Sequence, residues 1–574
     1  MKKLMLGDEA VARGAYEAGV RVVSSYPGTP STEITEFAAQ YKDINCEWAP
    51  NEKVAAEVAF GAAMAGARSM TCMKHVGVNV AADPLFTAAY TGVAGGMVVA
   101  CADDPAMHSS QNEQDSRYYA RAAHIPMLEP SDSQECRDYT KLAFALSEQY
   151  DTPVFVRLTT RIAHARSAVS LEDRAEIEVK PYQRDFMKYV MMPGMARKRH
   201  VVVEQRMNAL TEAANTLPVN RVEMGEKSLG VICSGACYAY VKEALPSASV
   251  LKLGLVHPLP RKLIEDFAGQ VERLVVIEEL EPVIEQQVAS WGIKVEGKTL
   301  TGLQGELSVS RLRHMFGQEA SLEPQDTLPA RPPVLCPGCP HRGTFYAMKK
   351  LKLNVMGDIG CYTMAALPPL NMLDACLCMG ASIGMAFGAE KAQGKEFSRK
   401  TVAVLGDSTF IHSGITALID AVYNGGTITV VILDNRITGM TGHQQNPATG
   451  RNILGEPAPQ LDLEALCAAC GVRHVRVVDP FDQKEMLRAL KEETARETVS
   501  VIIARRPCVL LLKEKTIPAT VKDCRNCGVC LGLGCPAIER GEQGMRINGA
   551  LCVDCGLCAT VCPFKAIHAG RESE

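Results

Sequence analysis

Two cysteines stand two residues apart in the stretch CPGCPHRG, residues 336–343, and a histidine and an arginine follow them. The same short spacing is found in half of a zinc site, a redox disulfide, two ligands of an iron–sulfur cluster, and an ordinary loop. Eight residues do not decide between these four possibilities. The other cysteines, and the elements that must position them, have to be considered as well.

The densest group of cysteines lies near the C-terminus, where eight of the 22 cysteines fall in residues 524–562. CVDCGLCATVCP matches the bacterial ferredoxin run C-x2-C-x2-C-x3-C-P, and CRNCGVCLGLGCP has one extra residue before its last cysteine. In such runs the fourth thiolate crosses over to the other cluster. The spacing predicts two [4Fe–4S] clusters rather than a zinc ribbon. Their ligands are Cys524, Cys527, Cys530 and Cys562 for one cluster, and Cys535, Cys552, Cys555 and Cys558 for the other.

A different chemistry is indicated by residues 401–435, TVAVLGDSTFIHSGITALIDAVYNGGTITVVILDN. Two apolar, strand-like runs enclose a segment of helical spacing that stops at Gly-Gly, which predicts a βαβ unit. Asp407 and Asn435 each follow the end of a strand, at the edge where open α/β sheets bind ligands. Such a pair can share one Mg²⁺ with phosphate oxygens. The alternative is a plain Rossmann-like unit with a turn aspartate.

This segment resembles the thiamine diphosphate motif, in which GDG is followed at a distance by NN. Here the letters are GDS and DN, and the two departures fall outside the coordinating positions. The resemblance implies that Asp407 and Asn435 hold Mg²⁺ together with the carbonyl of Ile437. As cofactor-binding residues it implies Gly406, Asp407, Ser408 and Asn435.

The N-terminal region, residues 1–165, alternates strand-like runs such as GMVVACADDP and TPVFVRLTT with helices rich in small residues. This alternation predicts a second doubly wound α/β layer. Glu52 stands near the start of one such helix, NEKVAAEVAFGAAMAGA, where a buried carboxyl group suits general acid–base work. Glu57 on the same helix suits a structural role.

Four stretches of this region resemble the 2-oxoacid:ferredoxin oxidoreductases: SYPGTPSTEI, NEKVAAEVAFGAAMAGA, MKHVGVNVAADP and HSSQNEQDSRYYA. Within them, the chain resembles the large subunit of the indolepyruvate type from end to end. The resemblance implies that Glu52 binds the aminopyrimidine ring of thiamine diphosphate and that Thr29 faces the cofactor and the substrate. It also implies that Lys74 and His75 contact the substrate, and the alternative for these two is a solvated loop.

The resemblance bears on CPGCPHRG too. Pyruvate-type relatives hold a third [4Fe–4S] cluster beside the thiamine, on a CxxC, a Gly-Cys turn and a Pro-Cys after the last strand. This chain has these elements in the same order, which implies a proximal cluster rather than buried thiols on Cys336, Cys339, Cys361 and Cys508. Cys376 and Cys378 are assigned instead to a helix turn. His341 is then expected near the thiamine diphosphate, and Arg342 near the substrate carboxylate.

The predicted fold class is therefore α/β and multidomain. The strand-like runs SLGVICSG, SVLKLGLVHPLP and ERLVVIEEL mark one further α/β region. With the resemblance, these regions imply five domains: an aminopyrimidine-binding domain at 1–165, a helical linker at 166–225, a transketolase C-terminal-like domain at 226–325, a diphosphate-binding domain at 326–515, and a two-cluster ferredoxin-like domain at 516–574. Outside the clusters, buried thiols are expected at Cys233, Cys237, Cys467 and Cys470.

Composition limits the possible partners. The chain has 61 basic and 65 acidic residues among 574, so nucleic acid is not an expected partner. We find no signal peptide and no run of about 18 apolar residues, and so expect a cytoplasmic protein without a membrane partner.

The resemblance implies an activity: oxidative decarboxylation of an arylpyruvate such as indolepyruvate with coenzyme A, which yields arylacetyl-CoA, CO₂ and reduced ferredoxin. It implies a small beta subunit, an external ferredoxin and an alpha2beta2 assembly. Another 2-oxoacid is the main alternative substrate. A non-oxidative thiamine decarboxylase would not need the cluster cysteines, and a pure electron-relay subunit would not need Glu52 or the Mg²⁺ pair.

Overall fold

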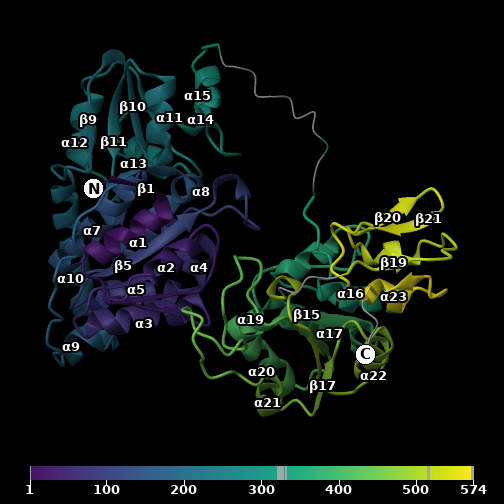
Figure 1. The fold of residues 1–574 in the computed structure, drawn as a ribbon. Coiled ribbons are helices and arrows are strands. Elements are labelled where there is room, and N and C mark those ends of the chain that lie inside the picture. Colours follow the sequence, from purple (N-terminus) through teal and green to yellow (C-terminus); the bar gives the residue numbers. More distant parts are fainter. Residues whose placement is uncertain (1, 320–328, 330–331, 513–516, 571–574) are drawn as a thin grey trace. The chain divides into compact units, whose positions relative to one another are not determined.

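The computed structural model describes residues 2–319, 329, 332–512 and 517–570. The chain forms two compact units, Met1–Thr327 and Leu328–Glu574 (Figure 1). The domain boundaries predicted at 325/326 and 515/516 lie outside the described residues.

A seven-stranded sheet with the order β12-β6-β7-β5-β4-β2-β3 is the centre of the first unit, and β3 (Asn45–Trp48) is one of its edge strands. Four of its parallel strands bury almost every side chain: β2 (Val22–Ser25), β4 (Ser69–Lys74), β5 (Met97–Asp103) and β7 (Val154–Thr159). Strands buried on both faces are expected where helices cover both sides of a parallel sheet.

Alternate residues of β5 show these two faces directly. Val98 and Ala100 belong to one hydrophobic core, together with α1 (Gly7–Glu17) and α7 (Ser133–Tyr150). Val99 and Cys101 belong to the other, together with α3 (Glu52–Met64) and α5 (Ala82–Thr91). The doubly wound layer predicted for the N-terminal region is thereby confirmed.

The segment expected to be a helical linker also contributes strands. β8 (Arg166–Ser170) pairs antiparallel with β1 (Lys2–Leu6) at one end of it, and β9 (Arg221–Glu223) joins the next sheet at the other. Between them lie the short helix α9 (Phe186–Tyr189) and the 22-residue helix α10 (Pro193–Ala214). One face of α10 is buried through Val203, Met207 and Leu210.

The next sheet has the order β13-β10-β11-β9 and contains β10 (Glu226–Ser234), β11 (Ala248–Leu253) and β13 (Leu274–Ile277). The run SVLKLGLVHPLP forms two strands that belong to different sheets. After Gly254, β12 (Leu255–His257) pairs antiparallel with β6 (Met127–Leu128) of the seven-stranded sheet. A Cβ atom at Gly254 would lie 2.6 Å from the Tyr139 hydroxyl, so only glycine fits this crossing.

The second unit contains a five-stranded parallel sheet with the order β14-β15-β16-β18-β17. The predicted βαβ unit is present, since β15 (Thr401–Gly406) and β16 (Thr429–Asp434) are parallel neighbours. Their connection passes through α19 (Asp407–Thr409), a π-helical turn and α20 (Ile415–Tyr423). The other elements of this layer are β14 (Asn354–Met356), β17 (His474–Val478), β18 (Ser500–Arg505), α16 (His341–Leu351), α17 (Ala381–Gln393), α21 (Leu463–Ala469) and α22 (Gln483–Thr494).

The C-terminal part of this unit is small and rich in cysteine. It has two two-stranded sheets, β19 (Thr520–Val521) with β22 (Ile567–His568) and β20 (Ile538–Gly541) with β21 (Gly544–Ile547), and the helix α23 (Leu557–Val561). Partly buried cysteines pack among its few apolar side chains. Regions of this size commonly need metals or other cross-links for stability.

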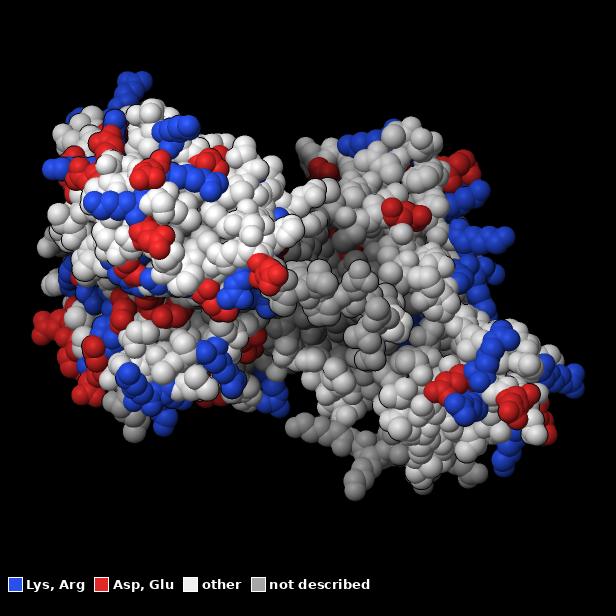
Figure 2. Space-filling view, turned by 90° about the horizontal axis from the view of Figure 1, so that it is seen from above, with Lys and Arg blue, Asp and Glu red and all other residues white. Residues whose placement is uncertain are grey.

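Among the described residues, every helix is too short or too polar to span a bilayer. On the face of the first unit seen in Figure 2, basic and acidic side chains are interspersed, without a broad area of one sign. This mixture accords with the net charge of −4.

Candidate functional site

Glu52 is the first residue of α3, and the residue is only 5% exposed. Asn51 caps this helix by accepting a hydrogen bond from the Val54 N–H at 2.9 Å. Gly77, in α4 (His75–Val80), lies against the carboxylate: a Cβ atom there would be 2.9 Å from Glu52 Oε1. The room for the Glu52 side chain therefore depends on a glycine in the neighbouring helix.

Lys74 and His75 occupy the junction of β4 and α4, and both are buried, which contradicts the solvated-loop alternative. Lys74 Nζ donates a hydrogen bond to the Ser109 carbonyl. Burial lowers the pKa of Lys74 to about 8, and the nearby Asp104 carboxylate opposes that shift. Lys74 is therefore a cation at neutral pH but loses its proton in mild alkali.

His75 is 1% exposed. Neither ring nitrogen has a partner in ordinary hydrogen-bond geometry among the described residues, although the backbone of Asn112 lies beside the ring. Burial lowers the pKa of His75, against the carboxylates of Asp103 and Asp104, which raise it. A neutral imidazole can exchange a proton with a ligand.

Asp104 was not singled out from the sequence, yet it organises this site. Its carboxylate accepts hydrogen bonds from the Ser109 N–H at 2.7 Å, the Ser110 hydroxyl at 2.6 Å and the Thr160 hydroxyl at 2.7 Å. Burial opposes ionisation, but these bonds and Lys74 keep the pKa of Asp104 below its usual value. The available signal was its place directly after the strand-like run GMVVACAD.

Thr29 lies half-buried in the turn after β2. A Cβ atom at Gly28 would be 3.3 Å from Lys74 Cβ, so this turn packs against the start of α4. The Ser31 hydroxyl donates to the Gly28 carbonyl at 2.8 Å and fixes the turn. The structure thus brings the Thr29 turn to Lys74, and Glu52 to α4.

In the second unit, Asp407 and Asn435 follow the adjacent parallel strands β15 and β16, and both are buried. The two carboxylate oxygens of Asp407 accept backbone N–H bonds, from Ser408 at 2.7 Å and Arg436 at 3.1 Å. Burial and the charge of Asp434 raise the pKa of Asp407 to about 7. Carboxylate, amide and carbonyl oxygens at one sheet edge are the ligand types that Mg²⁺ prefers, so the residues present fit the predicted ion.

The four cysteines predicted for a proximal cluster come together although 172 positions separate the first from the last. Burial raises the pKa of the Cys361 thiol to about 11, and the charges of Cys508 and Cys336 act in the same direction. Burial likewise raises the pKa of Cys339 to about 12, with smaller contributions from Cys336 and Cys361. Cys376 and Cys378 are exposed, and the Asp358 carboxylate is the main charge that acts on both thiols.

This thiol group lies against the Asp407–Asn435 edge. The Cys508 N–H donates to the Asn435 carbonyl at 2.9 Å. A Cβ atom at Gly439 would stand 3.5 Å from Cys361 Sγ and 3.9 Å from Asn435 Nδ2. A proximal cluster and the diphosphate-binding loop would therefore be direct neighbours.

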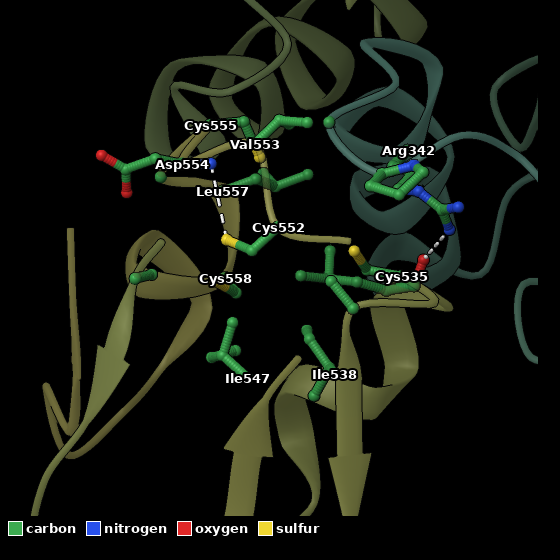
Figure 3. Close-up of a pocket in the computed structure, with 16 residues that line it drawn as sticks. Arg342, Cys535, Ile538, Ile547, Cys552, Val553, Asp554, Cys555, Leu557 and Cys558 are labelled. Carbon is green, nitrogen blue, oxygen red and sulfur yellow. Dashed lines mark hydrogen bonds between the residues drawn. The ribbon is translucent and has the colours of Figure 1, made fainter. Parts of the chain in front are cut away.

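The eight C-terminal cysteines line two separate cavities, in the two sets that their spacing predicts. Cys535, Cys552, Cys555 and Cys558 line one cavity, together with Arg342 (Figure 3). Cys524, Cys527, Cys530 and Cys562 line the other.

Backbone N–H groups point at several of these sulfurs. Asn526 and Met545 each donate to Cys524 Sγ at 3.4 Å, and Ala566 donates to Cys562 Sγ at 3.3 Å. Such bonds are typical of iron–sulfur sites. Among the described residues, no cysteine belongs to a group of three or more ligand atoms within 4.8 Å of one another. A single tetrahedral zinc ion would need its thiolate sulfurs closer together than that.

The structure separates the roles of His341 and Arg342. The His341 ring is buried and packs edge-on against Tyr362, with ring centroids 5.7 Å apart, and burial lowers its pKa to about 4. The Tyr362 hydroxyl donates to the Thr409 hydroxyl at 3.2 Å, and Thr409 belongs to the turn that begins at Asp407. The Tyr362 side chain therefore connects His341 to that turn. Arg342, predicted near the substrate carboxylate, instead donates to three backbone carbonyls and points to the ferredoxin-like region.

Asp358 was also missed from the sequence. Its buried carboxylate accepts N–H bonds from Ile359 at 2.9 Å, Gly380 at 2.9 Å and Ser382 at 3.0 Å, which holds the loop that carries Cys361. Of the cysteines expected to be buried thiols, Cys470 is partly exposed and three are buried: Cys233, Cys237 and Cys467.

Three family models match the chain. One described as pyruvate flavodoxin/ferredoxin oxidoreductase, thiamine diphosphate-binding, covers residues 13–224. A thiamine pyrophosphate enzyme C-terminal TPP-binding domain covers residues 358–504, and a 4Fe-4S binding domain covers residues 545–568. Together with the two doubly wound layers and the cysteine cavities, these matches define a thiamine diphosphate-dependent, iron–sulfur 2-oxoacid:ferredoxin oxidoreductase.

Similar proteins narrow the class. Indolepyruvate oxidoreductase subunit IorA of Archaeoglobus fulgidus is 40% identical over 100% of this chain and 98% of its own length. The protein of the same name from Pyrococcus abyssi is 42% identical over 100% of this chain and 97% of its own. The chain belongs to the family of indolepyruvate ferredoxin oxidoreductase alpha subunits. A solved 2-oxoglutarate:ferredoxin oxidoreductase from Magnetococcus marinus is 18% identical, with a TM-score of 0.47 over 55% of this chain and 65% of its own.

Proposed function

We propose that the chain oxidatively decarboxylates arylpyruvates of the indolepyruvate type with coenzyme A. For each 2-oxoacid anion and coenzyme A thiol, the products are arylacetyl-CoA, CO₂, one proton and two electrons, which reduce two ferredoxins. The observation that carries the proposal is the contact between the two kinds of site: the Cys508 N–H donates to the carbonyl of Asn435. A decarboxylase that transfers no electrons does not need cluster cysteines next to its thiamine diphosphate site.

When bound, thiamine diphosphate would supply a nucleophilic carbon for the 2-oxo group and an acceptor for the electron pair left by CO₂. In this proposal Asp407, Asn435 and the Ile437 carbonyl hold Mg²⁺ on its diphosphate, with Gly406 and Ser408 in the same turn. Glu52 holds a proton at the aminopyrimidine ring, a task suited to its buried position at a helix start. Thr29 borders the ring from the turn after β2.

Lys74 and His75 are proposed to contact the substrate. The buried Lys74 ammonium binds the carboxylate of the 2-oxoacid, because an ion pair gains strength where water is excluded. The neutral His75 ring donates a hydrogen bond from its N–H to the oxygen of the 2-oxo group. Both residues belong to a junction that Asp104 and Ser109 hold in place.

The electrons are proposed to leave through three [4Fe–4S] clusters on the cysteine sets described above. The proximal set borders the Mg²⁺ residues, and the C-terminal sets provide two further sites. Because the similar proteins are named as subunits, we propose a small beta subunit as partner and an alpha2beta2 assembly, with an external ferredoxin as acceptor.

The test is anaerobic viologen reduction by the purified complex with indolepyruvate, phenylpyruvate, pyruvate or 2-oxoglutarate, each with and without coenzyme A. We expect the highest kcat/KM for the arylpyruvates and a strict need for coenzyme A. A preference for 2-oxoglutarate or pyruvate would contradict the arylpyruvate assignment. CO₂ release without viologen reduction would identify a non-oxidative decarboxylase.

The proximal cluster has its own test. Cys508→Ala should lower iron by four atoms per chain and abolish viologen reduction, while Cys376→Ala, at a thiol outside the set, should leave both unchanged. Full iron content in Cys508→Ala would remove the proximal cluster from the proposal.

A further inference from the structure

Arg342 is a buried cation where the CPGCPHRG loop meets the ferredoxin-like region, and the residue is 2% exposed. Its guanidinium donates to the carbonyls of Leu335 and Cys336 on one side and, at 2.9 Å, to the carbonyl of Leu533 on the other. Leu533 stands two residues before Cys535. One side chain thus connects the loop of a proximal thiol to the loop of a C-terminal thiol.

Burial lowers the pKa of Arg342, and the groups that oppose this shift are cysteine thiols, those of Cys535, Cys339, Cys336 and Cys555. A buried guanidinium is costly unless negative charge compensates it. Three carbonyl dipoles satisfy its hydrogen bonds but leave its charge uncancelled. A [4Fe–4S] cluster with four thiolates is a dianion when oxidised and a trianion when reduced, so a cluster on each side would supply that charge.

The loops on the two sides of Arg342 are in direct contact. Gly338, with φ +73°, packs so closely that a Cβ atom there would lie 2.4 Å from Val553 Cγ2 and 3.5 Å from Cys555 Cβ. Pro337, Gly338 and Arg342 line the cavity of the Cys535 set (Figure 3). The described residues that line the cavity of the Cys524 set include none from this loop.

We propose that Arg342 is the shared counter-ion of two neighbouring clusters, the proximal one and the one on Cys535, Cys552, Cys555 and Cys558. The inference rests on the proposed function, since it requires those clusters. A cation between two anions favours an added electron on either of them, and it lowers their mutual repulsion while both are reduced. The cluster of the Cys535 set is then the first acceptor in the tail, and the cluster of the Cys524 set the last.

The test compares Arg342→Gln and Arg342→Lys with the wild-type complex, by iron content and by redox titration followed with electron paramagnetic resonance. In Arg342→Gln we expect the ratio of oxidised to reduced cluster at a fixed potential to rise about tenfold, or about 59 mV for one electron, at two of the three clusters. The third cluster should not shift, and Arg342→Lys should stay close to wild type. Arg525→Gln is the matched control, because Arg525 lines the other cavity.

The possible outcomes distinguish the charge of Arg342 from its hydrogen bonds to the backbone. If Arg342→Gln holds all its clusters and their reduction potentials are unchanged, the inference is overturned. Arg342 would then serve only to hold backbone carbonyls together. Loss of both clusters in Arg342→Lys as well as in Arg342→Gln would also overturn the inference. The lysine keeps the positive charge, so such a loss would show that the charge alone does not hold the clusters. Loss in the glutamine variant only would support the inference. A wild-type complex without the proximal cluster would contradict the proposed function itself, and this inference with it.

Discussion

At the scale of single residues, burial gives the candidate groups their chemistry. Glu52, Lys74 and His75 are all at least nine-tenths buried, and each stands at the end of a secondary structure element. Desolvation is the largest influence on the pKa of both Lys74 and His75. The structure therefore brings together a lysine that titrates in mild alkali and a histidine whose lowered pKa leaves it neutral at pH 7.

Glu52→Gln should lower kcat by about 100-fold or more, because general acid–base groups contribute about 10²–10⁴. The visible iron–sulfur absorption should be unchanged, since Glu52 belongs to the first unit and the cysteine sets to the second. Glu57→Gln is the control on the same helix, since Glu57 is exposed and ion-paired with Lys53. Retained turnover in Glu52→Gln would remove its assigned role.

Lys74 predicts a pH dependence. Its pKa is lowered to about 8, so the ammonium predominates below that pH and is lost above it. We expect KM for the 2-oxoacid to rise about tenfold per pH unit above 8, with kcat less affected, in steady-state assays from pH 6.5 to 9.5. In Lys74→Arg the rise of KM should begin at higher pH, because a guanidinium stays protonated. If KM rises over the same pH range in Lys74→Arg as in the wild type, the titrating group is not Lys74.

At the scale of elements, glycines set the distances between functional side chains. In Gly77→Ala the new Cβ atom would lie 2.7 Å from Glu52 Cγ, so the carboxylate must move. We expect activity and thiamine diphosphate affinity to fall at least tenfold while the protein stays folded, measured by kinetics, calorimetric titration and circular dichroism.

Gly61→Ala in α3 is the matched control for this change. Nothing lies within 4 Å of a Cβ atom at Gly61, so the substitution should preserve activity. It should stabilise the helix by about 0.5–1 kcal/mol, because alanine has the higher helix propensity. Equal activity losses in the two variants would indicate that α3 tolerates no change, rather than that Gly77 makes room for Glu52.

At the scale of the whole molecule, the order of the cysteine cavities predicts which substitutions block electron transfer through the C-terminal clusters. Cys527 is exposed and lines the cavity of the Cys524 set, whose lining among the described residues includes none from CPGCPHRG. Cys527→Ser should remove one cluster and most ferredoxin reduction, yet retain substrate-dependent reduction of a small viologen. Cys558→Ser, in the other cavity, should lower both activities. Full ferredoxin reduction by Cys527→Ser would contradict the proposed order.

Local spacing alone predicted much of this molecule. The two ferredoxin runs, the βαβ unit with Asp407 and Asn435, and Glu52 at a helix start all depend on residues close together in the chain. The structure confirms the strand–helix–strand order and gathers the C-terminal thiols into the predicted sets, whereas ligation itself stays a prediction. Short-range patterns suffice here because loop and helix geometry fixes neighbours within a few residues.

Tertiary structure decided what depends on distant neighbours. The place of Asp104 after a strand-like run marked it as a sheet-edge residue, but only the fold shows that it binds the Ser109 segment beside Lys74. The same holds for Asp358, which binds the Cys361 loop, and for β12, which leaves its sheet at Gly254. Arg342 shows the limit most clearly. Its position beside His341 predicted a substrate contact, but its partner is the Leu533 carbonyl, 191 residues away. A side chain's role follows from the charges and carbonyls packed around it, and only the folded chain brings those together.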